Sequence, residues 1–181
     1  GASKAVDELL IGANNLSAFV GVGGAWSAGT SAYTGTGLTL SGLKLGLAIL
    51  KETGGSARQW TGAKASATSA SFIGVSGLTV VASDVSVAIN RVASDNSVVD
   101  FGAQNLTVQT GTAGAPSTMV LDMAGSLGAL TQVSAAVEID AFGLLMARGT
   151  VTLQKSSGTV TVAGASKAVD ELLIGANNLS A

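Results

Sequence analysis

The clearest structural signal in the chain is the alternation LTLSGLKLGLAI at residues 38–49. Apolar residues occupy every second position on either side of the pair Ser41-Gly42, which is typical of a β-strand with one apolar face. At that pair the phase of the alternation changes, and in a straight strand this change would move the second half to the other face. A bend at the pair would keep both halves on one side, because glycine, asparagine and aspartate tolerate left-handed backbone.

The same pattern recurs along the chain, with Gly/Ser/Asn-rich segments between the alternating runs. The other phase changes fall at Asn14-Asn15, Ser83-Asp84 and Gln104-Asn105. A run of Val, Ile, Leu and Thr at this period predicts an all-β fold. The segment SKAVDELLIGA at residues 3–13 also fits a short helix capped by Ser3, but its alternation favours a strand.

An 18-residue segment occurs twice in the chain. The residues GASKAVDELLIGANNLSA at positions 1–18 return without a substitution at positions 164–181. We interpret residues 1–163 as one full tandem repeat and residues 164–181 as the start of the next. The alternative is a duplicated terminus on a single domain. A long repeat of this kind is typical of structural or adhesive proteins rather than of enzymes with one pocket.

Two architectures fit the bent alternating runs. The first is a β-solenoid-like stack of about eight coils of ~20 residues per repeat, with a rise of roughly 38 Å per repeat at the usual strand spacing. The second is an antiparallel β meander or sandwich, in which each unit is a bent strand followed by a turn. In a meander, reflection about the intervening turns brings Ser41-Gly42 and Ser83-Asp84 onto the same place, residues 67–68. The regular period favours the solenoid.

The composition excludes several functional classes. The 181 residues are 47% hydrophobic but only 4% aromatic and 11% charged, and the mean hydropathy is +0.51. A net charge of −2 without a basic cluster argues against nucleic acid as a partner. No apolar run approaches the ~18 residues of a membrane helix, so we expect no membrane insertion.

The residues that most often carry catalysis are missing. The chain has no histidine and no cysteine, which removes the commonest general base and the usual zinc and thiolate chemistry. Glu138 and Asp140 flank Ile139 as a carboxylate pair, but solvated charges on a strand face explain them better. We therefore expect no enzymatic activity, no catalytic residue and no cofactor.

Two groups of residues are candidates for binding. Asp95, Asn96 and Asp100 supply oxygen donors in ASDNSVVD and are candidate calcium ligands, although no EF-hand pattern is present. Trp26 and Tyr33 lie in the small-residue segment AWSAGTSAYTGTG, where aromatic side chains could contact a neighbouring molecule. Such aromatics more often fix a loop to its own sheet.

A resemblance to the long tandem repeats of giant bacterial surface or secreted adhesin-like proteins is carried by NNLSAFVGVGG, GLTLSGLKLGLAILK and VSAAVEIDAFGLL. The resemblance implies an extracellular or cell-surface location and a structural role in a filament, a surface coat or an adhesin. It transfers no functional residue. The expected partners are neighbouring repeats or copies of the chain. The alternative function is a calcium- or glycan-binding adhesive module that contacts a glycan or a cell surface.

Overall fold

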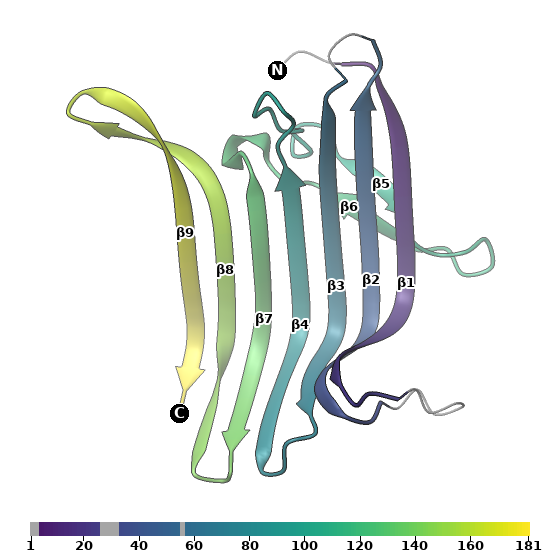
Figure 1. Ribbon diagram of the computed structural model, residues 1–181, viewed down its shortest axis with the longest axis vertical. Helices are drawn as coiled ribbons and strands as arrows, with labels where there is room; N and C mark the ends of the chain where they lie inside the picture. The colour runs from purple at the N-terminus through teal and green to yellow at the C-terminus, as the bar shows by residue number, and fades with distance from the viewer. Residues whose placement is uncertain (1–3, 26–32, 55–56) are drawn as a thin grey trace.

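The computed structural model describes residues 4–25, 33–54 and 57–181, and it is built almost entirely of β-strands (Figure 1). Seven strands form one antiparallel sheet in the order β1-β2-β3-β4-β7-β8-β9, and β5 and β6 form a separate hairpin. The strands are β1 (Val6–Val22), β2 (Thr36–Glu52), β3 (Gln59–Ile73), β4 (Leu78–Arg91), β5 (Leu106–Gln109), β6 (Thr118–Leu121), β7 (Leu130–Ala141), β8 (Leu145–Val162) and β9 (Ala165–Ser180). A short 3-10 helix, η1 (Gly125–Leu127), precedes β7.

The all-β prediction is confirmed, and the arrangement is the meander rather than the solenoid. Strands that follow each other along the chain pair antiparallel, whereas stacked solenoid coils would pair in parallel. The prediction of about eight equivalent coils is wrong for the same reason. The sheet holds seven strands, and the segment between β4 and β7 leaves the sheet to form the β5–β6 hairpin.

Three of the four predicted bends are present. Asn15, Gly42 and Asp84 have positive φ angles of 56°, 59° and 51°, in the left-handed region. The register shifts by one residue next to Asn15 in β1 and next to Asp84 in β4, as a β-bulge requires. Ser41 pairs with Ser69, and Ser69 pairs with Ser83, so the bends of β2 and β4 meet across β3, at the place that a meander predicts.

The fourth predicted bend, at Gln104-Asn105, is wrong. These residues lie in a turn and loop before β5 rather than inside a strand. Asp100 explains the difference, because its carboxylate accepts hydrogen bonds from the backbone N–H groups of Ala103 and Gly125 at 3.1 and 2.9 Å. These bonds turn the chain where an alternating strand was expected.

The bends keep apolar side chains on one face of the sheet. β7 has no residue of positive φ, so Val133 and Ile139, an even number of residues apart, lie on the same face. Val133 pairs with Val87 and Ile139 pairs with Val80, on opposite sides of the bend in β4. The extra residue at the bend therefore corrects the phase, as the sequence predicts.

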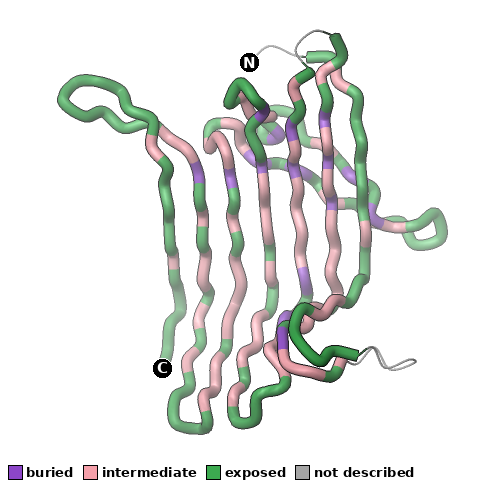
Figure 2. The backbone as a smooth tube through the Cα atoms, viewed as in Figure 1, coloured by how far each residue is buried: buried purple, intermediate pink, exposed green. Residues whose placement is uncertain are grey.

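The other face of the sheet carries the hydrophobic core, under the β5–β6 hairpin. Buried residues gather where this hairpin crosses the sheet (Figure 2). The core consists of Ala48, Leu50, Trp60, Ala93, Phe101, Val108, Leu121, Met123 and Leu130. We call this side the covered face and the opposite side, which holds Val133 and Ile139, the open face.

Glycines make room for the hairpin. A Cβ on Gly46 would lie 2.8 Å from the Met119 side chain, and one on Gly62 would lie 2.5 Å from the Phe101 ring. A side chain at Gly46 would therefore push the hairpin off the sheet, and one at Gly62 would displace Phe101, which lies in the turn before the hairpin.

Candidate functional site

The two edges of the seven-stranded sheet are made of the same sequence. β1 and β9 lie at opposite ends of the strand order, and residues 4–18 of the β1 edge reappear as residues 167–181 of the β9 edge. Six antiparallel steps separate them, so the two strands run in the same direction (Figure 1). The β9 edge is thus a second β1 without a β2 beside it, and we treat the two edges as the candidate site.

The same bend forms in both copies. Asn15 has φ 56° in β1, and its copy Asn178 has φ 53° in β9. The register shifts beside both residues. Local sequence therefore sets the conformation of this strand regardless of which neighbour it has.

The two copies direct their backbone groups to opposite neighbours. In an antiparallel ladder the N–H and C=O of one residue point to the same side, and successive residues alternate. The carbonyl of Ala5 accepts a hydrogen bond from the N–H of Thr53 at 3.0 Å, so odd-numbered residues of β1 before the bend face β2. Ala165 is the copy of Ala2 and pairs with Val162 across a two-residue turn, so its N–H and C=O point to β8. In β9, the copies of the even-numbered β1 residues therefore face β8, and the copies of the odd-numbered residues face away from it. The groups that β9 leaves unpaired are therefore those that β1 uses to bind β2.

Gly12 and its copy Gly175 also differ in how closely other parts of the protein pack against them. A Cβ on Gly12 would lie 1.9 Å from the carbonyl oxygen of Gln109 in β5, which no side chain could tolerate. A Cβ on Gly175 would meet nothing within 4 Å. Glycine is required at this position only where a β5–β6 hairpin covers it. Its presence within an alternating run is a sequence signal for a close backbone approach that the sequence analysis did not use.

Apolar side chains of the segment are more exposed in β9 than in β1. Leu10 and Ile11 are 38% and 44% exposed, and their copies Leu173 and Ile174 are 60% and 64% exposed. The additional exposed area in β9 lies where a following β2 and β5 would pack.

The register of the sheet makes a second copy of β1 face the same way as the first. One row of paired residues crosses all seven strands and consists of Ala13, Leu45, Ala65, Val87, Val133, Leu153 and Ile174. The row begins at Ala13 and ends at Ile174, the copy of Ile11. This shift of two residues is even, so the copied segment presents the same side chains to the same face.

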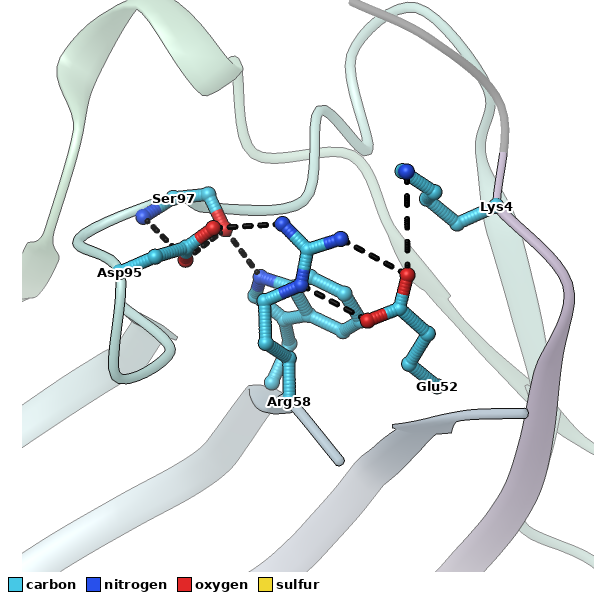
Figure 3. Close-up of polar contacts among 6 residues, drawn as sticks. Lys4, Glu52, Arg58, Asp95 and Ser97 are labelled. Atoms are coloured by element: carbon cyan, nitrogen blue, oxygen red, sulfur yellow. Dashed lines mark hydrogen bonds and ion pairs between the residues drawn. The ribbon is translucent and has the colours of Figure 1, made fainter. Parts of the chain in front are cut away.

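A polar network fastens the ends of β1, β2 and β3 (Figure 3). Arg58 donates two hydrogen bonds to the Glu52 carboxylate, at 2.8 Å from Nε and 2.7 Å from Nη2. Lys4 of the β1 edge lies 3.8 Å from Glu52 Oε1. The hydrogen bonds to Glu52 and then to Asp95 raise the pKa of Arg58 above its usual range. Lys167, the copy of Lys4, has no Glu52 beside it in this chain, because no β2 follows β9.

The calcium candidates are engaged by groups of the protein itself. Asp95 accepts hydrogen bonds from Ser97 and binds Arg58 Nη1 at 2.5 Å, and these bonds lower the pKa of its carboxyl below the usual range. Asp100 holds backbone N–H groups, the first of them that of Gly125, and its pKa is also lowered. Asn96 lies at the turn with φ 62°. In residues 4–25, 33–54 and 57–181, no group of three or more acidic, histidine or cysteine side chains is placed to hold a metal ion.

The remaining candidates lie between β1 and β2, on the inner strand β7 or outside the described residues. Trp26 lies outside the described residues. Tyr33 is half-buried and stacks on Phe19, with ring centroids 5.6 Å apart, so it packs within its own hairpin. Glu138 and Asp140 line an open hollow of about 470 Å³, where Asp140 accepts a hydrogen bond from the N–H of Gly143 at 2.9 Å.

Comparisons with protein-family models, with curated proteins and with solved structures find no match to this chain. Among the described residues, no helix reaches the length and apolar content needed to traverse a bilayer. The two sheet edges are therefore the feature of the molecule that indicates a function.

Proposed function

We propose that the chain is a structural repeat in which successive 163-residue units continue one antiparallel sheet. The observation that carries this proposal is that β9 has the sequence, direction and bend of β1, and lacks only the neighbour that β1 has. In such an array, β9 is the first strand of the following repeat. Its outward N–H and C=O groups pair with the next β2, and the next β5–β6 hairpin covers Gly175.

The mechanical consequence is a ribbon whose strands lie across its long axis. Each repeat adds six strands to the sheet. At about 4.8 Å per strand, the ribbon grows by about 29 Å per repeat. This value replaces the 38 Å that eight solenoid coils would give. Every strand edge inside the ribbon is paired, so only its two ends expose unpaired backbone.

The role of such a ribbon is to provide stiffness and repeated lateral surfaces in an extracellular bacterial filament, surface coat or giant adhesin. Continuous backbone pairing between repeats removes the flexible linker found between separate domains. A chain without cysteine folds without oxidation and is compatible with export. The resemblance to adhesin-like repeats supports the same location.

The test compares the present chain with a chain of two repeats, in which residues 1–163 precede a second copy of residues 1–181. Hydrogen exchange is measured residue by residue at the central copy of the β9 segment. The amides of Leu172 and Ile174 face away from β8, and we expect their exchange to slow about 100-fold when β2 of the second repeat pairs with them, equivalent to about 2.7 kcal/mol of opening free energy. The amide of Leu173 faces β8 in both chains and serves as the control. Unchanged exchange at Leu172 and Ile174 would show that the repeats fold as separate units.

A further inference from the structure

The open face is an apolar surface that extends beyond the edges discussed above. Between the bends and the strand ends near Lys51 and Arg91, most of its side chains are aliphatic, and only Thr61 and Thr131 interrupt the apolar rows. The members are Leu9, Ile11, Ala13, Leu45, Leu47, Ile49, Ala63, Ala65, Val85, Val87, Ile89, Val133, Ala135, Val151, Leu153, Leu172 and Ile174. We call this area the aliphatic field. The β5–β6 hairpin packs on the other face, where Gly12, Gly46 and Gly62 make room for it.

The covered face differs in chemistry outside the footprint of the hairpin. Ser66, Ser86 and Ser134 lie in one paired row there, and the hydroxyls of Ser86 and Ser134 are hydrogen-bonded at 2.8 Å. A row of hydroxyls is compatible with water. On the aliphatic field, Val133 and Leu153 are 36% and 44% exposed, and the whole surface is larger than the apolar patches common on monomers.

The shape of the aliphatic field is self-complementary, because a ridge of large side chains lies beside a groove of small ones. β2 presents the large side chains Leu45 and Leu47, and the adjacent β3 presents Ala65 and Ala63 at the paired positions. A two-fold axis parallel to the strands, between β2 and β3, would bring each leucine of one copy over an alanine of the other. This is the arrangement that an isologous interface requires, because one patch supplies both the ridge and the trough.

The area meets the lower limit for a specific pair. About an axis between β2 and β3, the four strands β1 to β4 of one copy lie over the same four strands of the other copy. Four strands about 4.8 Å apart, each contributing about eight residues at about 3.4 Å, give a face of about 500 Å² per copy. The pair therefore buries about 1,000 Å² in total, the size at which specific interfaces begin. The field also has a charged rim, because Lys51, Arg91 and Lys155 are the next residues on this face after Ile49, Ile89 and Leu153. Lys155 forms an ion pair with Asp170 at 3.6 Å. An apolar centre with a polar rim is the usual composition of an interface.

We propose that two copies of the chain pack open face to open face and form a two-layered β-sandwich. The sheets lie about 10 Å apart, and the aliphatic fields interdigitate to form a second core. This inference concerns a different surface from the sheet edges and does not depend on the continuation of the sheet. If the sheet does continue, two ribbons with the same repeat length cover each other at every repeat.

The experiment places a charge on one face of the sheet at a time. All chains carry Leu172→Pro, which deletes an N–H on the free side of β9 and so prevents edge pairing without breaking the β8–β9 ladder. We expect this chain to sediment as a dimer, Ala65→Glu to convert it to a monomer, and the neighbouring Ser66→Glu on the covered face to leave it dimeric. The near-UV circular dichroism of buried Trp60 reports whether each variant keeps its fold.

A second measurement covers the case in which Ala65→Glu does not fold. The chain has no cysteine, so single-cysteine variants can be mixed and oxidised. Leu45→Cys mixed with Ala65→Cys should give several-fold more disulfide-linked dimer than Lys44→Cys mixed with Ser66→Cys, which lie on the covered face. A monomeric chain, a dimer that survives Ala65→Glu, or equal cross-linking on both faces would overturn the proposal. Binding of the monomer to phosphatidylcholine vesicles, abolished by Ala65→Glu, would overturn it in favour of lipid.

Discussion

β1 and β9 share one sequence but have different surroundings, and the comparison separates what that sequence determines from what its neighbours determine. Both copies form a strand, and both bend at the same asparagine, Asn15 in β1 and Asn178 in β9. They differ in packing, because Gly12 lies under β5 while Gly175 has nothing above it. Strand and bend are therefore local properties. The requirement for glycine comes from the neighbouring hairpin. β9 keeps this glycine as Gly175 although no hairpin covers it.

The largest effect expected from this comparison is a crossed response to proline. Leu9 directs its N–H toward β2 and Leu10 directs its N–H away, whereas in β9 Leu173 faces β8 and Leu172 faces away. We expect Leu9→Pro and Leu173→Pro each to destabilise the chain by about 3 kcal/mol, because a ladder hydrogen bond is lost inside a paired strand. Leu10→Pro and Leu172→Pro should cost about 1 kcal/mol or less, since proline is tolerated on the free side of an edge.

Urea unfolding followed by tryptophan fluorescence measures these four variants against the unmodified chain. The design is internally controlled, because each strand carries one sensitive and one tolerant leucine. Equal destabilisation by both prolines of a strand would contradict the assigned direction of the backbone groups. Equal effects at Leu9 and Leu172 would mean that the two edges are not paired as described.

The next effect concerns the shared glycine. Gly12→Val places a side chain against the carbonyl of Gln109 and should cost about 2–3 kcal/mol, because the hairpin must shift away from the sheet. Gly175→Val should change stability by less than about 0.5 kcal/mol, since the added side chain meets open space and valine favours strands. The same urea measurement checks both. A large cost at Gly175 would show that β9 is covered in the isolated chain.

Sequence pattern predicted the parts of this structure that depend on local rules. The alternation around Ser41-Gly42 predicted a bent strand, and the positions of the bends relative to the turns were compatible with a meander. The alternation could not distinguish a meander from a solenoid, because both folds place apolar residues at every second position. Antiparallel pairing depends on contacts between strands, and a single strand does not encode them.

The segment between β4 and the β5–β6 hairpin shows the second limit. Val99, Phe101 and Ala103 alternate as a strand would, yet the hydrogen bonds of Asp100 to Gly125 and Ala103 turn the chain there. Phe101 is buried as part of the core instead of extending the sheet. The identity of residues 1–18 with 164–181 predicted that the two ends of the unit are equivalent, but only the strand order places them at opposite edges.

A smaller effect is expected from the polar network that fastens the β1 end of the sheet. Ser97 first, and then Arg58, hold the pKa of Asp95 below its usual value, so the stabilisation is present above the unfolded pKa of about 4 and is lost as the pH falls through the lowered value. We expect stability to decline between about pH 5 and pH 2, and Asp95→Asn to flatten part of this decline while lowering stability at pH 7. Urea midpoints measured across this range check the prediction. An unchanged slope in Asp95→Asn would assign the acid limb to other carboxylates, such as Asp100, whose pKa is also lowered.

The smallest effect tests the comparison at a single charge. Lys4 lies 3.8 Å from Glu52, but the lysine side chain is 48% exposed and Glu52 is already bound by two nitrogens of Arg58. Lys4→Ala should therefore cost about 0.5 kcal/mol or less, and salt should reduce the difference. Lys167→Ala should cost nothing in this chain, because no β2 follows β9. In a chain of two repeats the copy of Glu52 in the second repeat would lie beside Lys167. Lys167→Ala should then acquire the cost and the salt dependence of Lys4→Ala, and a lysine that stays neutral in both chains would argue against a shared strand between repeats.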